Sequence, residues 1–558
     1  MVAKQHPKPR RPSIYTRCCS KPKKAVMKRP AGANLECSVP LPEVDAQSPP
    51  ATKAWNREPR GPSRKGPKDM KELDAWPSSL CKVVFGPSNG DDEAGSNRAS
   101  LFQSNMRQGG WMDTDCSGVG GAEQYVSMVV KSASDFVEIP DNAIISWSAS
   151  EPVTARLNIL HTMSNGPLHT WADIRTKLHP RAREQLIRLR PPSSISKDKT
   201  RKKELSKFYG AMNSYLRRRP RRCFLTTAVC ERHGTECPID PPDDGRWTLN
   251  ISGLNCIPYT TMGSQLGLGD PLIESQHTWA NEQSWKKKTF AIVEESPNMQ
   301  PHIISESVPH LVWLAIIASP TLLGIPIRRL RRHMFGYDNE LYIWCGPEPH
   351  RIQSHFEELF FAEPVLDINS LMLEDTSHKS FYKELAKSRG LYLNNEHAED
   401  LPAISGILPP GGCQRFIDYD LAYEELRKLD SNVEMMADLS QDPTKRPRQS
   451  VVDGDGQGEF QTQLQSSLGY SFKFQRLISP HLLMRLHGYP EDHVIFNSGY
   501  SSKLLQQWCG DGFHLGINAA WFLYCFSHVY SRSLIAGDPT AGPTNVIEAP
   551  EAPDDDVD

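Results

Sequence analysis

"DTDCSGVGGAEQYV", residues 113–126, is the stretch of this sequence that decides the fold. A short apolar start precedes its glycines, and a run with helical spacing follows them. Glycines permit a tight turn and a close approach of the backbone to a ligand, and the N–H groups of a following helix point at that ligand. The stretch therefore indicates a first strand, a loop that binds a nucleotide-like cofactor, and a helix. A structural glycine-rich turn is the alternative.

Strand-like and helix-like pieces alternate around this stretch, over residues 110–345. "NAIISWSA" (142–149) and "KTFAIVEE" (288–295) read as short buried strands, and residues 170–189 have helical spacing. This alternation favours an α/β fold, in which a mostly parallel sheet carries helices on both faces. Any cofactor would then lie at the carboxyl ends of the strands.

The two ends of the chain differ strongly in charge, although the net charge of the 558 residues is only -2. The first thirty residues hold ten Lys/Arg and no acid, and the last eight, "EAPDDDVD", hold five acids and no base. We predict a disordered basic arm over residues 1–100 and a disordered acidic tail over residues 531–558. The basic arm suits a nucleic acid or a nuclear import receptor, and two solubilising tails are the plainer interpretation.

Cysteine usage and apolar runs indicate an intracellular protein. The 13 cysteines form no regular framework, and the basic N-terminus lacks the apolar segment of a secretory signal. The longest apolar stretch, residues 311–327, is interrupted by Pro320 and Pro326 and is short for a bilayer span, so we predict buried core and no membrane association. With the basic arm, these features predict a nuclear location.

Two residues are candidates for chemistry in the middle of the chain. Cys256 lies in "ISGLNCIPYTTMG" (251–263), a loop flanked by glycines, where a cysteine is either a nucleophile or a small buried hydrophobe. Glu294 follows an apolar strand 38 residues later, where a carboxylate enters a cleft or caps a helix.

Basic residues form two further candidate sites. In "GIPIRRLRR" (324–332), a strand would put Arg329 and Arg331 on one face, where they could bind a phosphate or a base carbonyl. The alternative is a basic edge strand whose charges prevent aggregation. Residues 197–222 hold eleven Lys/Arg with Phe208, Tyr209 and Tyr215 among them. That mixture suits a nucleic-acid backbone, and a solvated helix face is the alternative.

A soft-ligand cluster follows the second basic stretch. Cys223, Cys230, His233 and Cys237 have a Cys-x6-Cys-x2-His-x3-Cys spacing that four zinc ligands could use. Because the first interval is longer than in common zinc knuckles, we favour reduced thiols and assign no metal site from the sequence.

In this order, the motifs resemble those of C5-cytosine-specific DNA methyltransferases. The set comprises SGVGG (117–121), the Cys256 loop, "GLGDP" (267–271), VEES (293–296), "GIPIRRLRR", "RLISPHLLMRLHGYPED" (476–492) and "GDGFHLGINAAWF" (510–522). The resemblance covers residues 110–345 and 472–526. It implies a Rossmann-like S-adenosylmethionine-dependent methyltransferase core over residues 101–345 and 471–530. A target-recognition region would occupy residues 346–470. Within it, residues 430–460 are polar and rich in Gly, Asp and Gln, which predicts a mobile insertion.

The resemblance also implies roles for individual residues. Cys256 falls on the nucleophile that attacks a flipped cytosine, and Glu294 on the glutamate that contacts the ring. Arg329 and Arg331 fall on the two arginines of the family's Gln-x-Arg-x-Arg motif. The implied binding residues for S-adenosyl-L-methionine are Ser117, Gly118, Val119, Gly120, Gly121, Gly510 and Asp511.

Several positions depart from the family pattern. Asn255 replaces the proline before the nucleophile, Glu295 and Asp511 replace asparagines, and Ile327 replaces the glutamine of the arginine motif. Negative charge from Glu295 or Asp511 would oppose formation of a Cys256 thiolate if either lies close to it. The sequence thus supports a DNA (cytosine-5) methyltransferase. Two alternatives are a catalytically impaired methyltransferase-like protein that binds nucleic acid and an RNA cytosine-5 methyltransferase.

Overall fold

The computed structural model describes residues 64–86, 92–116, 118–191, 198–254, 256–260, 270–391, 404–443, 449–452 and 458–537. The chain divides into two compact units, Met1–Glu58 and Pro59–Asp558, and every described residue belongs to the second. One predicted site residue, Ser117, lies outside the described residues. Most of the predicted basic arm and acidic tail also lie outside them.

A seven-stranded sheet organises the second unit, in the order β4-β3-β2-β7-β8-β10-β9. The strands from β4 to β8 are mutually parallel, and β10 is antiparallel to both of its neighbours. Their bounds are β2 Gly110–Asp115, β3 Ile144–Ser150, β4 His169–Trp171, β7 Trp247–Gly253, β8 Phe290–Glu295, β9 Leu311–Ala318 and β10 Arg331–Asp338. The predicted Rossmann-like, mostly parallel sheet is confirmed, and the strands expected near 142–149 and 288–295 are β3 and β8.

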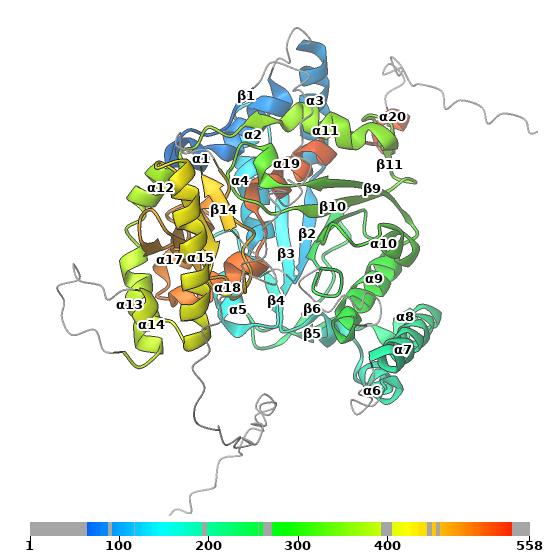
Figure 1. Cartoon of the computed structure of the whole chain (residues 1–558). Coiled ribbons are helices and arrows are strands. Elements are labelled where there is room, and N and C mark those ends of the chain that lie inside the picture. Colours follow the sequence, from blue (N-terminus) through cyan, green and yellow to red (C-terminus); the bar gives the residue numbers. More distant parts are fainter. Residues whose placement is uncertain are drawn as a thin grey trace, which may run out of the picture. The chain divides into compact units, whose positions relative to one another are not determined.

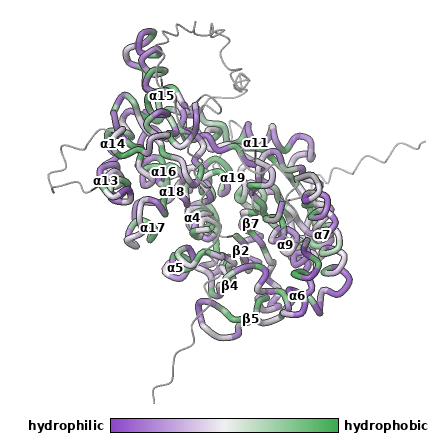
Figure 2. Tube along the Cα trace, turned by 60° about the horizontal axis from the view of Figure 1, so that its bottom comes forward, coloured by the Kyte–Doolittle hydropathy of each residue, from purple (hydrophilic) through white to green (hydrophobic). Residues whose placement is uncertain are grey.

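Helices cover both faces of the sheet, as predicted (Figure 1). On one face, α2 (Trp76–Phe85), α4 (Gly121–Ala133) and α19 (Leu515–Phe526) share a core with the central strands. On the other face, α9 (Glu274–Lys286) and α10 (His302–Ser307) pack on β8, β9 and β10. Figure 2 shows apolar segments gathered along α19 and the central strands.

Strand β8 shows why these residues form a central strand. Phe290 and Ile292 belong to the core beneath α4 and α19, whereas Ala291 and Val293 belong to the core beneath α9. Side chains alternate between the faces of a strand, so a strand covered on both faces needs a continuous apolar run. Burying one such large side chain stabilises the fold by about 1.5–3 kcal/mol.

A second, smaller core falls in the sequence between the two stretches that build the large sheet and its helices, and it overlaps the region 346–470 that was predicted as an insertion. It joins α13 (His378–Ser388), α14 (Ile404–Ile407) and α15 (Pro410–Leu429) to a four-stranded sheet, β14-β13-β15-β16. The strands are β13 Glu434–Asp438, β14 Gln449–Val452, β15 Gly469–Ser471 and β16 Arg476–Leu477.

The prediction of a mobile insertion within 430–460 is wrong for its described residues. Met435, Met436 and Ala437 are buried in β13, which pairs with β14 and β15, so apolar packing holds this polar-flanked segment in a sheet. Residues 444–448 and 453–457 of this segment lie outside the described residues.

The predicted boundaries of the two disordered ends are also wrong. Helices α1 (Met70–Asp74), α2 and α3 (Asp92–Gln108) fall largely before residue 101, and Leu73, Leu80 and Val84 are buried in the main core. The basic, proline-rich composition of the residues before these helices predicts disorder, whereas the apolar spacing within the helices is what lets them pack on the core. At the other end, β17 (Val529–Ser531) and α20 (Arg532–Gly537) extend past residue 530.

The remaining elements connect these layers. The expected helix over 170–189 is instead the edge strand β4, a short 3-10 turn and α6 (Pro180–Leu189), because Pro180 starts a new helix.

No helix among the described residues has both the length and the apolar character of a membrane span. The other elements are β1 Arg64–Lys65, α5 Thr154–Thr162, α7 Asp198–Arg218, α8 Pro220–Cys223, β5 Thr227–Val229, β6 Glu236–Pro238, β11 Tyr342–Trp344, α11 Ile352–Phe360, β12 Ala362–Glu363, α12 Ile368–Glu374, α16 Pro480–Leu486, α17 Val494–Asn497 and α18 Ser502–Asp511.

Candidate active site

The candidate site lies at the carboxyl ends of β2, β3, β7 and β8. The strand order reverses between β2 and β7, since β3 and β4 follow on one side of β2 and β7 and β8 on the other. Such a switch point is where open α/β sheets bind ligands. The register places Asp115 opposite Ser252 and Gly253 opposite Glu294, so the loops that leave these strands meet at one edge.

The glycine loop leaves β2 and enters α4. Gly118 and Gly120 have positive φ angles of 61° and 78°, which glycine adopts without strain. Among the described residues, apart from its chain neighbours, no heavy atom lies within 4 Å of the position where a Gly118 Cβ would stand. Gly120 begins the helix without any side-chain cap, so Gly121 and its neighbours present backbone N–H groups at the open end of α4. Val119 is buried and anchors the loop to the core.

Glu151, which the sequence reasoning missed, closes this loop from the end of β3. Its carboxylate accepts hydrogen bonds from the Gly118 backbone N–H at 2.9 Å and from the Val153 N–H at 3.0 Å. Burial raises the pKa of the Glu151 carboxyl, and nearby Arg156 opposes that rise. Its position directly after an expected strand, one strand beyond the glycine loop, was the available signal.

The last predicted motif reaches the same edge. Gly510 and Asp511 end α18, and Asp511 accepts hydrogen bonds from Arg156 at 2.5 Å and Gln465 at 2.6 Å. Arg156 also lies 3.6 Å from Glu151. A chain of contacts therefore joins Asp511 to the glycine loop.

Cys256 lies just after β7, on the other side of the switch point. It is half-buried, and its carbonyl accepts hydrogen bonds from the N–H groups of Tyr259 at 2.9 Å and Thr260 at 3.1 Å. These bonds form a single turn that starts at the cysteine. Asn255 and residues 261–269, which include Gly263, lie outside the described residues.

Glu294 is the centre of the polar contacts at this edge. Its Oε1 lies 3.3 Å from Arg331 Nε and 3.8 Å from Arg329 Nη2, and its Oε2 accepts a hydrogen bond from Asn518 Nδ2 at 3.2 Å. Asn518 comes from α19 and was missed by the sequence reasoning, because it lies in a wholly buried apolar helix. Both arginines lie near Glu294, but the strand expected to align them begins only at Arg331, so Arg329 reaches Glu294 from the irregular segment before β10.

The two arginines nevertheless differ in their surroundings. Arg329 is 3% exposed, and its guanidinium donates to the carbonyls of Cys509, Gly510 and Gly512. Burial lowers the pKa of Arg329 to about 10. Arg331 begins β10, has a more accessible side chain, and donates to the Leu330 carbonyl. Arg329 thus ties Glu294 to the α18–α19 turn, whereas Arg331 is the freer of the two.

The charged groups at this edge influence the thiol of Cys256 in opposite directions. Burial raises the pKa of Cys256, the cations of Arg331 and Arg329 oppose the rise, and Glu295 and Glu294 add to it. Glu295 thus opposes formation of the thiolate, whereas Asp511 pairs with Arg156. Burial also raises the pKa of Glu295 to about 8, so this carboxyl is largely neutral at pH 7.

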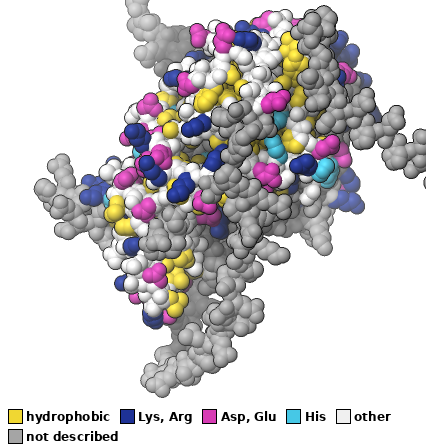
Figure 3. Space-filling view, turned by 90° about the horizontal axis from the view of Figure 1, so that it is seen from above, with side chains coloured by type: hydrophobic (Ala, Val, Ile, Leu, Met, Phe, Trp, Pro, Cys, Tyr) yellow, Lys and Arg dark blue, Asp and Glu magenta, His cyan; other side chains and the backbone are white. Residues whose placement is uncertain are grey.

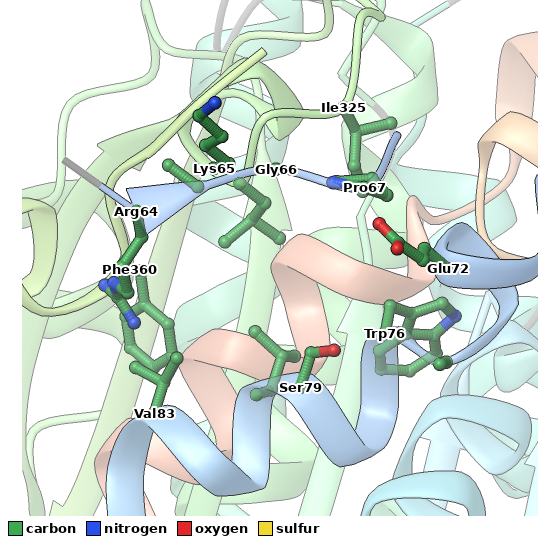
Figure 4. A pocket seen from close by; sticks show the side chains of 14 residues that line it. Arg64, Lys65, Gly66, Pro67, Glu72, Trp76, Ser79, Val83, Ile325 and Phe360 are labelled. Carbon is green, nitrogen blue, oxygen red and sulfur yellow. The ribbon is translucent and has the colours of Figure 1, made fainter. Parts of the chain in front are cut away.

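The basic stretch over residues 197–222 and the pocket of Figure 4 lie outside this site. Phe208 and Tyr209 are buried in the core beside α6, so they offer no stacking surface, whereas Arg218, Arg219, Arg221 and Arg222 are exposed. Figure 3 shows a face on which acidic and basic side chains are interspersed. The pocket of Figure 4 lies between β1, α2 and Phe360 and includes no predicted site residue.

Comparisons with known proteins gave matches only among solved structures. No protein-family model and no curated protein match the chain. The S. pombe Dnmt2 methyltransferase has 10% identity and a TM-score of 0.36, covering 74% of this chain and 97% of its own. The Entamoeba histolytica methyltransferase EhMeth has 12% identity and a TM-score of 0.34, covering 75% of this chain and 98% of its own.

A third match is a putative DNA modification methyltransferase encoded within an E. coli prophage. It has 13% identity and a TM-score of 0.31, covering 74% of this chain and 99% of its own. Each of these three chains is a methyltransferase by name.

Proposed function

We propose that this protein is an S-adenosyl-L-methionine-dependent DNA (cytosine-5) methyltransferase with Cys256 as its nucleophile. The observation that carries the proposal is the convergence of Cys256, Glu294, Arg331 and the glycine loop at one edge of the sheet. These groups come from four separate stretches of the chain, and the same edge holds the topological switch point.

The residues around the glycine loop fit the proposed cofactor. Among the described residues, space is open beside Gly118, no side chain caps the start of α4, and Glu151 offers a carboxylate of the kind that accepts ribose hydroxyls. Within the described part of the chain, the buried hydroxyls of Tyr125 and Tyr489 have no hydrogen-bond partner. Buried polar atoms of this kind are satisfied by a ligand or by water. When bound, S-adenosyl-L-methionine would supply an electrophilic methyl group.

The chemistry requires a strong nucleophile beside the base. Cytosine C5 is a poor nucleophile until a thiolate adds to C6, which turns the ring into an enamine-like species. Cys256 is suited to that addition because thiolates are strongly nucleophilic near neutral pH. Once C5 carries the methyl group, loss of the C5 proton to a base allows the Cys256–C6 bond to break and the thiolate to leave.

In this proposal, Glu294 and Arg331 assist the addition. Glu294 would contact the N3 and N4 edge of cytosine and favour protonation at N3 while Cys256 attacks. Arg331 would hold the O2 carbonyl and stabilise the charge that develops on the ring. Because Arg329 is occupied by three backbone carbonyls, we assign it a positioning role toward Glu294. A duplex target would have to flip its cytosine out to reach this edge.

The direct test follows labelled methyl from S-adenosyl-L-methionine into unmethylated DNA or RNA. We expect label in DNA cytosine with the wild type and none with Cys256→Ala. The exposed Cys345 supplies the matched control, since Cys345→Ala removes a thiol outside the site and should keep activity. DNA containing 5-fluorocytosine, which cannot lose its C5 substituent as a proton, should remain covalently attached to the wild type.

Burial raises the pKa of Cys256 and so disfavours its nucleophilic thiolate form. This supports one competing function, a nucleic-acid-binding protein of the same fold without catalysis. Absence of label and of the covalent complex, despite measurable DNA binding, would favour that function and contradict the enzyme. Label appearing in RNA alone would identify the RNA cytosine-5 methyltransferase instead.

A further inference from the structure

Four potential metal ligands meet beside the outermost strand of the sheet, away from the candidate active site. The donor atoms of His169, Cys230, His233 and Cys237 all lie within 4.8 Å of one another. His169 begins β4, and the other three belong to the β5–β6 hairpin. We propose that these four side chains bind a structural zinc ion that fastens the hairpin to the sheet edge.

The ligand set differs from the one that sequence spacing suggested. Cys223 lies in another core, next to Phe224 and Leu216, with its thiol directed at the Tyr215 carbonyl. His169, more than fifty residues before the hairpin, takes the fourth place because β4 runs alongside it. Two thiolates and two neutral imidazoles would leave Zn²⁺ with no net charge, which suits a partly buried site.

The geometry is close to that of a tetrahedral site. Zn–S and Zn–N bonds of about 2.3 Å and 2.0–2.1 Å place neighbouring S and N ligand atoms about 3.5 Å apart. Cys237 Sγ lies 3.3 Å from His233 Nδ1, and the rings of His169 and His233 are 5.1 Å apart. His169 Nδ1 is buried without a hydrogen-bond partner among the described residues, as a donor atom that awaits a metal would be.

The surrounding backbone already holds the thiol ligands in place. The Thr170 N–H donates to Cys230 Sγ at 3.3 Å, and the Glu231 N–H donates to the Thr170 carbonyl at 2.8 Å. Gly234, with a φ of 69°, makes the tight turn between His233 and Cys237. Hydrogen bonds to ligand sulfur and a glycine turn orient metal ligands before the metal binds. The hairpin also covers β4, which would otherwise be an open sheet edge.

The experiment measures zinc in the full chain after exhaustive dialysis against metal-free buffer with a reductant. We expect about one zinc per chain in the wild type, from the single ligand set. Cys237→Ser and His169→Asn should each lose most of that zinc. Cys223→Ser is the matched control, a buried cysteine a few residues from the hairpin, and it should keep the zinc.

Cobalt substitution of the wild type provides a test that does not depend on folding of the variants. Co²⁺ should give the intense visible absorption of a tetrahedral site with thiolate charge-transfer bands, and added zinc should abolish it. A wild type without zinc or cobalt spectrum, a Cys230–Cys237 disulfide found by mass spectrometry, or zinc retained in both ligand variants would overturn the proposal. Loss of zinc from Cys223→Ser as well would overturn the assigned ligand set.

Discussion

At the scale of single residues, the site differs from its family pattern most clearly at Glu295. A carboxyl stands where the resembled family has an asparagine, and it is 1% exposed next to Glu294. Its Oε2 accepts a hydrogen bond from the Ser296 N–H, while Oε1 has no partner among the described residues. An acid in such surroundings stays protonated at neutral pH and becomes charged only above it.

Replacing Glu295 tests whether its carboxylate lowers the reactivity of the Cys256 thiol. The pKa of Glu295 is raised to about 8, so Glu295→Asn should leave the alkylation rate of Cys256 unchanged at pH 7. At pH 9, where the wild-type carboxyl is ionised and opposes the thiolate, the variant should react faster by about threefold, equivalent to half a pKa unit. Iodoacetamide labelling read out on the Cys256 peptide by mass spectrometry measures the rate.

Glu138→Gln is the control for that measurement, because Glu138 is an exposed acid elsewhere on the surface. It should follow the wild type at both pH values. Equal rates for Glu295→Asn and wild type at pH 9 would show that this carboxyl does not act on the thiol.

At the scale of elements, the helices before the glycine loop are part of the main fold. Helix α2 packs against α4 and α19, and Trp76 donates its indole N–H to the Gly488 carbonyl at 3.1 Å, next to the last turn of α16. The same tryptophan lines the pocket of Figure 4 together with Arg64 and Phe360. Truncation at the sequence-predicted boundary near residue 101 would therefore remove part of the core.

Trp76→Ala should lower the free energy of unfolding by about 3–5 kcal/mol, because it empties a buried site and leaves a carbonyl unpaired. Denaturant unfolding followed by circular dichroism measures the change. Lys82→Ala, an exposed position on the same helix, should change it by less than about 0.5 kcal/mol. A similar small effect for both variants would mean that α2 does not belong to the cooperative unit.

At the scale of the whole molecule, basic charge is unevenly placed despite the net charge of -2. Arg218 ends α7, and Arg219, Arg221 and Arg222 follow within four residues, all exposed. Of the neighbouring aromatic residues, Phe208 and Tyr209 are buried and Tyr215 is half-buried, so we expect these arginines to act on nucleic acid mainly through phosphate contacts. Such contacts give affinity without sequence preference.

Arg221→Ala combined with Arg222→Ala should weaken DNA binding and reduce the slope of log K against log salt by about 2, given roughly one counterion per phosphate contact. Fluorescence anisotropy over a salt series measures both quantities. Lys82→Ala with Lys131→Ala removes two exposed charges from other helices and should leave the slope unchanged. An unaltered slope in the arginine variant would exclude this surface from the DNA interface.

The sequence by itself determined the central architecture and the identity of the candidate site. Glycines after an apolar strand, and a cysteine and a glutamate at the ends of later strands, are local signals. In a parallel sheet, the ends of successive strands meet at one edge whatever the connections are. The strands, the glycine loop and the convergence of Cys256 and Glu294 follow from those signals.

Only the tertiary structure decided which distant residues complete these sites. Glu151, Asn518 and His169 are brought in by packing between elements far apart in the chain, and no spacing rule relates them to their partners. Arg329 and Arg331 look equivalent in sequence, yet backbone carbonyls of the α18–α19 turn occupy one of them. Burial likewise sets the raised pKa of Cys256 and Glu295, because desolvation depends on everything that surrounds a group and not on its neighbours in sequence.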